Sequence, residues 1–148
     1  DAAGPSRFED AAAELRARHG RAIVDLVLLA LAGALGALCR YGTYRWFSTF
    51  TDPSFPWATV AVNCAGSFLF GAVVVLAEEQ ELISARTKIV VLVGFLGAFT
   101  TFSTFAFETV ELMRVGETVR ALVNAALQNL GAVACVVLGA VTARTLAS

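Results

Sequence analysis

Residues 94–105 read Gly94-Phe95-Leu96-Gly97-Ala98-Phe99-Thr100-Thr101-Phe102-Ser103-Thr104-Phe105, inside a long apolar segment. The stretch mixes glycines and hydroxyl residues with phenylalanines, a mixture that a purely lipid-facing helix does not need. Glycine weakens a helix and lets backbones approach closely, and hydroxyls satisfy backbone groups freed by a helix break. Phenylalanine ring edges carry partial positive charge. We therefore predict an interrupted membrane helix that lines an ion site; the simpler alternative is a packing seam of small residues.

The composition is that of a membrane protein. Of the 148 residues, 57% are hydrophobic and 16% are charged, and the mean hydropathy is +0.72. A soluble domain is normally close to half apolar and about one-quarter charged. The length suits one domain with about four spans, because each span needs roughly 20 residues. The net charge of −1 gives no reason to expect a nucleic-acid partner.

Four apolar segments follow a polar leader. We expect the leader, residues 1–21, to form a surface helix and residues 22–148 to form a four-span membrane domain. The predicted fold class is an all-α membrane protein with the third helix interrupted near its middle. Its spans cover about residues 22–47, 57–77, 89–113 and 121–143.

Polar residues within the spans are the candidate site residues. Asn63 is the most polar residue of the second span, and a buried amide there faces either the helix bundle or a water-filled path. Asn124 and Gln128 are four residues apart and share a helix face, which is either packing contact or one wall of a pore. Arg40 lies near the end of the first span and either lines an anion-attracting vestibule or extends to the lipid headgroups.

The distribution of basic residues gives little indication of which side of the membrane each end of the chain occupies. The leader, middle connector and tail hold seven of the arginines and lysines, and the opposite side holds four. Several of the seven lie far from the membrane in the leader, so the charges near the span ends are almost balanced. Such a balance allows insertion in both orientations, which would permit an antiparallel homodimer.

Four segments, taken in order and spacing, resemble the Fluc/CrcB family of small fluoride channels. The resemblance covers roughly residues 28–140, and the third segment is the most specific. The leader lies outside it. The segments are Gly33-Ala-Leu-Gly36-Ala-Leu-Cys-Arg40-Tyr41, Thr59-Val-Ala-Val-Asn63-Cys-Ala-Gly66-Ser67-Phe68, residues 94–105, and a fourth span with Asn124.

The resemblance implies a passive fluoride channel in the plasma or inner membrane, which exports fluoride and so reduces its toxicity. It implies an antiparallel, dual-topology dimer with two pores and a structural sodium ion at its centre, held by the backbone carbonyls of Gly97 and Thr100. Arg40 matches a vestibule arginine, and Glu108 matches an acidic position after the third segment. The side chains that match the anion pathway are Asn63, Phe102, Phe105, Ser103, Thr104, Asn124 and Gln128.

Three positions depart from the family pattern. Ala98 and Ala58 stand where glycine is common, and each adds only a methyl group. Gln128 is longer than the small polar residue usual at its position, which weakens the pathway assignment on the fourth span.

Other classes of function fit less well. A small multidrug-type proton antiporter is the main alternative, but it needs a titratable group within the membrane, and Glu108 is the only candidate and lies near a span end. A non-transporting membrane subunit would tolerate apolar substitutions at the Phe, Thr and Asn positions named above, and the composition of residues 94–105 argues against it. No catalytic triad, metal-ligand cluster or phosphate-binding loop indicates an enzyme, and Cys39, Cys64 and Cys135 stand in apolar surroundings as packing residues.

Overall fold

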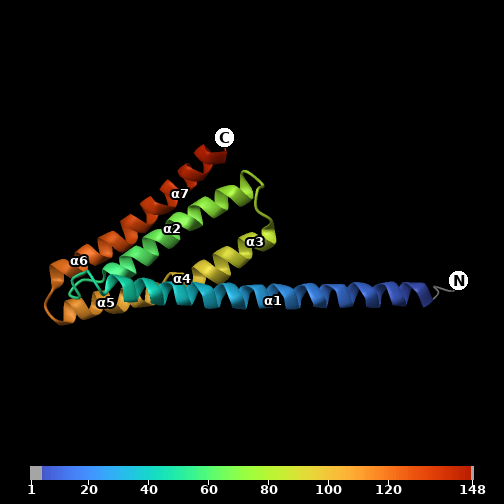
Figure 1. Ribbon diagram of the computed structural model, residues 1–148, viewed down its shortest axis with the longest axis horizontal. Helices are drawn as coiled ribbons and strands as arrows, with labels where there is room; N and C mark the ends of the chain where they lie inside the picture. Colours follow the sequence, from blue (N-terminus) through green and yellow to red (C-terminus); the bar gives the residue numbers. More distant parts are fainter. Residues whose placement is uncertain (1–4, 148) are drawn as a thin grey trace.

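A computed structural model describes residues 5–147, and the regular elements in that range are all helices. Four helical stretches are long and apolar enough to cross a membrane (Figure 1), so the predicted all-α fold with four spans is confirmed. The π-helical segments are labelled η. In chain order the elements are α1 (Pro5–Phe47), α2 (Trp57–Glu78), α3 (Ala85–Ile89), η1 (Val90–Leu96), α4 (Gly97–Phe99), α5 (Phe102–Arg114), α6 (Thr118–Ala126), η2 (Leu127–Gly131) and α7 (Ala132–Ala147).

α1 is a single helix of 43 residues. Its N-terminal part projects beyond the other helices (Figure 1), and nearly all side chains of residues 9–21 are exposed. The leader expected to be a surface helix over residues 1–21 is therefore, from Pro5 onward, the first part of the helix that continues into the first span. Residues 1–4 lie outside the described residues.

Glycines set the close spacing of two helix pairs. α2 and α7 lie side by side (Figure 1), and a Cβ atom on Gly139 of α7 would collide with the backbone carbonyl of Phe68. α1 packs on η1 in the same way, because a Cβ atom on Gly36 would collide with the carbonyl of Phe95. Backbone atoms cannot move aside as a flexible side chain can, so both contacts require glycine.

The surface of the bundle is apolar, and its interior combines an apolar core around Val62, Leu96 and Phe99 with buried polar side chains. Thr59, Thr101, Asn124 and Gln128 are buried, while many leucine and valine side chains on all four spans are exposed. This distribution suits lipid outside and a hydrogen-bonded polar network inside. The buried polar side chains belong to all of the spans except the first.

Ion pairs tie the helices together at the end where α2 finishes. The guanidinium of Arg144 donates to both carboxylate oxygens of Glu79, at 2.7 and 2.6 Å. These bonds hold the pKa of the Glu79 carboxyl below its ordinary value and join α7 to the C-terminal end of α2. Two further pairs are Arg86 with Asp25 at 2.7 Å and Lys88 with Glu78 at 2.8 Å.

Candidate functional site

Thr100 and Thr101 separate α4 from α5. Their backbones are extended, with φ/ψ of −80°/161° and −153°/112°. The hydroxyl of Thr101 accepts a hydrogen bond from the N–H of Thr104 at 3.2 Å and caps α5. The carbonyls at the end of α4 and the first N–H groups of α5 therefore lack the partners they would have in a continuous helix.

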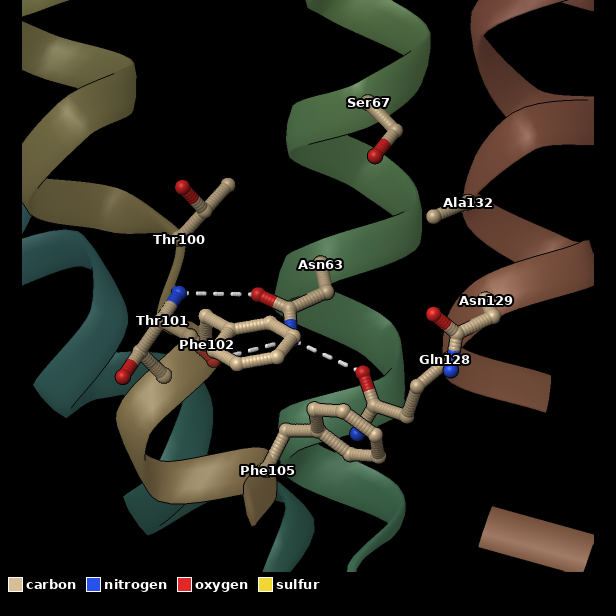
Figure 2. Close-up of a pocket in the computed structure, with 9 residues that line it drawn as sticks. All are labelled: Asn63, Ser67, Thr100, Thr101, Phe102, Phe105, Gln128, Asn129 and Ala132. Carbon is tan, nitrogen blue, oxygen red and sulfur yellow. Dashed lines mark hydrogen bonds between the residues drawn. The ribbon is translucent and has the colours of Figure 1, made fainter. Parts of the chain in front are cut away.

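Asn63 of α2 binds both backbone groups of Thr101. Its Oδ1 accepts from the Thr101 N–H at 2.8 Å, and its Nδ2 donates to the Thr101 carbonyl at 3.1 Å (Figure 2). In a continuous helix that N–H would donate to the carbonyl of Gly97, four residues earlier. Asn63 thus accepts the hydrogen bond from the Thr101 N–H, which in a continuous helix would donate to the Gly97 carbonyl.

A directed chain of hydrogen bonds continues from Asn63 into the fourth span. Asn63 Nδ2 donates to Gln128 Oε1 at 2.7 Å, and Gln128 Nε2 donates to Asn124 Oδ1 at 3.4 Å. Asn124 Nδ2 then donates to the hydroxyl of Thr109 at 2.9 Å, which donates to the carbonyl of Phe105 at 2.8 Å. Both polar side chains predicted on the fourth span therefore belong to one buried network with Asn63.

A cavity of about 180 Å³ lies beside this network. The rings of Phe102 and Phe105 stand edge to face there, with centroids 5.3 Å apart and planes at 69°. Phe105 is 8% exposed, whereas Phe102 is 75% exposed and leaves the cavity open on one side of the chain. The lining residues are Asn63, Ser67, Thr100, Thr101, Phe102, Phe105, Gln128, Asn129 and Ala132 (Figure 2).

Arg40 lies on another side of the α4–α5 junction. Its Nη1 donates to the carbonyl of Thr100 at 3.3 Å. A second cavity, of about 510 Å³, is lined by Arg40 together with Ala37, Tyr41, Tyr44 and Thr104. The guanidinium therefore contacts backbone at the junction and borders an open space.

The remaining predicted site residues lie close to the junction. Ser103 is exposed, and its hydroxyl is 3.3 Å from that of Thr101. Thr104 borders the cavity of Arg40, and neither residue lines the cavity beside Asn63. Gly97 is exposed at the start of α4, whereas Thr100 is half-buried.

The structure also adds residues that the sequence analysis did not assign to the site. The Tyr44 hydroxyl lies 2.7 Å from the Thr59 hydroxyl, which donates to Glu108 Oε1 at 2.7 Å. The other carboxylate oxygen, Glu108 Oε2, is buried without a hydrogen-bond partner among the described residues. Thr101 was visible as a member of the hydroxyl cluster, but nothing in the sequence distinguished it from its neighbours as the partner of Asn63.

Comparison with known proteins identifies the family. Residues 27–140 match the family described as "CrcB-like protein, Camphor Resistance (CrcB)". The chain belongs to the CrcB family. This membership confirms the resemblance seen in the sequence, and together with the four apolar helices it makes the chain a multi-pass membrane protein.

Several relatives of this CrcB chain carry the name "Fluoride-specific ion channel FluC". The protein of Nitrosococcus oceani is 46% identical over 114 residues, which cover 77% of this chain and 91% of the relative. That of Geobacter metallireducens is 41% identical over 124 residues, covering 84% and 100%. That of Thermus thermophilus is 44% identical over 99 residues, covering 67% and 77%.

Proposed function

We propose that this CrcB protein is a passive fluoride channel that exports fluoride across the plasma or inner membrane and so limits its toxicity. The observation that carries the proposal is the buried amide network that reaches the cavity of Phe102 and Phe105. The names of the relatives support fluoride as the ion.

The chemistry of the cavity suits a small, strongly hydrated anion. Fluoride leaves water only where other donors replace its hydration shell, and the Asn63 amide and nearby hydroxyls are such donors. Phenylalanine edges add a weak positive potential, which attracts an anion without binding it so tightly that conduction stops. The Arg40 guanidinium borders a wider cavity and would raise the local concentration of anions.

An antiparallel homodimer is part of the proposal. Phe102 is 75% exposed and Gly97 is also exposed, so a single chain leaves both the cavity and the α4–α5 junction uncovered. A second copy packed on this face would enclose them. The near balance of basic residues between the two sides favours insertion in both orientations, and the interruption between α4 and α5 would lie at the dimer centre.

A structural sodium ion at that centre would be held by the carbonyls of Gly97 and Thr100. These groups fit a hard cation, which prefers oxygen ligands. The Gly97 carbonyl lacks the Thr101 N–H donor, because Asn63 accepts that bond. The Thr100 carbonyl accepts from Arg40 and has a second lone pair. The ion would supply positive charge that offsets repulsion among anions in the pathways.

Anion efflux from liposomes that contain the purified protein tests the proposal. A fluoride electrode should record fast, passive release, and a chloride electrode should record little. An inserted protein that releases no fluoride would contradict the channel. Drug transport coupled to protons, and lost in Glu108→Gln, would instead support a proton-coupled antiporter.

A further inference from the structure

Both N–H groups of the Asn63 amide already have acceptors within the chain. One N–H donates to the Thr101 carbonyl at 3.1 Å, and the other donates to Gln128 Oε1 at 2.7 Å. An anion in the cavity needs one of these donors, because an amide nitrogen has only two hydrogens. Thr101 offers a backbone carbonyl at the junction, whereas Gln128 offers the end of a flexible side chain. The bond to Gln128 is therefore the one that an anion would replace.

The direction of the network fixes which atom Gln128 turns toward Asn63. At one end, the Thr101 backbone N–H can only donate, so Asn63 presents Oδ1 to Thr101 and Nδ2 to Gln128. At the other end, the Phe105 carbonyl can only accept, so the Thr109 hydroxyl donates to it and accepts from Asn124 Nδ2. Two backbone anchors thus place the Gln128 oxygen, with its lone pairs, where an anion would have to bind.

We propose that Gln128 is an internal competitor of the permeating anion: its carboxamide oxygen occupies the Asn63 N–H, and fluoride binds by displacing it. This inference rests on the proposed fluoride channel and adds a specificity-determining role for one side chain. The unusual length of Gln128 is what allows its oxygen to reach Asn63 from the fourth span. A short side chain at the same position would leave the Asn63 donor free.

Three local features make the displacement feasible. Gln128 lies in the π-helical segment η2, and such segments often mark functional sites in helices. Its other hydrogen bond, to Asn124, is long at 3.4 Å and holds the amide weakly. The 180 Å³ cavity borders Gln128 (Figure 2), so the side chain has space into which it can rotate.

Fluoride titration calorimetry on the purified dimer tests this competition. Gln128→Ala and Gln128→Met both remove the oxygen, and Met keeps the length of the side chain. Each should bind fluoride about two- to tenfold more tightly than wild type, because one competing hydrogen bond contributes about 0.5–1.5 kcal/mol. Gln80→Ala, at the chain's other glutamine, is the matched control and should change nothing. Unchanged or weaker binding in both Gln128 variants would overturn the proposal, and weaker binding would make Gln128 itself an anion ligand.

A measurement on the wild-type chain keeps the test independent of how the variants fold. Because the chain has two glutamines, ¹⁵N-glutamine labelling gives two side-chain amide signals, which Gln80→Ala assigns. Saturating fluoride should shift the Gln128 amide signal and leave that of Gln80 in place; an unshifted Gln128 signal in a protein that conducts fluoride would refute the competition. A wild-type protein that neither binds nor conducts fluoride would refute the proposed function, which is a separate result.

Discussion

The side-chain amide of Asn63 pairs with the backbone of Thr101 much as a neighbouring β-strand would, accepting from its N–H at 2.8 Å and donating to its carbonyl at 3.1 Å. The two residues are 38 positions apart. The extended conformation of Thr101 leaves both backbone groups free for such pairing, and Thr101 is buried, so unpaired groups there would be costly. One amide therefore stabilises the α4–α5 junction and also faces the cavity.

Asn63→Asp should impair both of these roles. A carboxylate still accepts from the Thr101 N–H but donates neither to the Thr101 carbonyl nor to an anion, and its charge repels fluoride. We expect fluoride efflux to fall by about 100-fold or more, and the free energy of unfolding to fall by about 1–3 kcal/mol for the unpaired carbonyl. Liposome efflux and thermal unfolding measure the two effects. Wild-type efflux from this variant would remove Asn63 from the pathway.

Substitutions of Phe102 and Phe105 should differ in their effect on protein stability but should impair fluoride efflux to a similar degree. Phe102 is 75% exposed in the chain, so Phe102→Ile should change the stability of the isolated chain by no more than about 0.5 kcal/mol. Phe105 is 8% exposed, so Phe105→Ile should cost about 1 kcal/mol. Both variants should lose most fluoride efflux, because an aliphatic side chain has no positive ring edge. Normal efflux from either folded variant would argue against its ring in the pathway.

Gly66 and Thr100 should show strong coupling in a double-mutant cycle. A Cβ atom on Gly66 would collide with the Cγ2 methyl of Thr100, so Gly66→Ala should destabilise the protein by about 1–3 kcal/mol. Thr100→Ser removes that methyl but keeps the carbonyl and the hydroxyl, which donates to Leu96 at 2.9 Å.

Thr100→Ser alone should therefore conduct fluoride almost normally, and the double variant should recover most of the stability that Gly66→Ala loses. Chemical denaturation of all four proteins measures the coupling. Additive losses would show that the methyl is not the obstacle. A severe loss of sodium dependence in Thr100→Ser would count against coordination through its backbone carbonyl.

The proposed sodium ion predicts that removal of sodium lowers the stability of the proposed dimer. An ion that binds only the folded protein stabilises it by about 2.7 kcal/mol when its concentration is 100 times its dissociation constant. Replacing sodium with a large organic cation should therefore lower the thermal midpoint, and adding sodium back should restore it. A midpoint that does not respond to sodium would remove the ion from the proposal, while leaving the anion pathway to be judged by efflux.

The Glu79–Arg144 contact should make the stability of the folded protein depend on pH in the acidic range. The pKa of Glu79 is lowered in the folded protein by the hydrogen bonds from Arg144, so the contact stabilises the protein above the unfolded-state pKa. That contribution disappears as pH falls through the folded-state pKa. Glu79→Gln should thus have a slightly lower thermal midpoint than wild type at neutral pH, and the two curves should converge in acid. Glu81→Gln, at a carboxylate that forms no ion pair among the described residues, should match wild type throughout.

The sequence by itself determined the fold class and the region of the site. Hydropathy is a local property, so four spans follow from residue order alone, and the mixture of glycine, hydroxyl and phenylalanine in residues 94–105 marked the α4–α5 region. The resemblance carried by the four segments identified the family, and the comparisons confirm it.

Only the tertiary structure decided which groups meet. The partners of Asn63 are a backbone unit in the third span and the Gln128 side chain in the fourth, and no local pattern specifies contacts between separate helices. The π-helical segments η1 and η2 follow no periodicity that the sequence revealed. The hydrogen bonds that link the side-chain amides all run in one direction, from Asn63 toward Thr109. That direction is set by the Thr101 backbone N–H at one end and the Phe105 backbone carbonyl at the other, because the packed helices hold both groups in place.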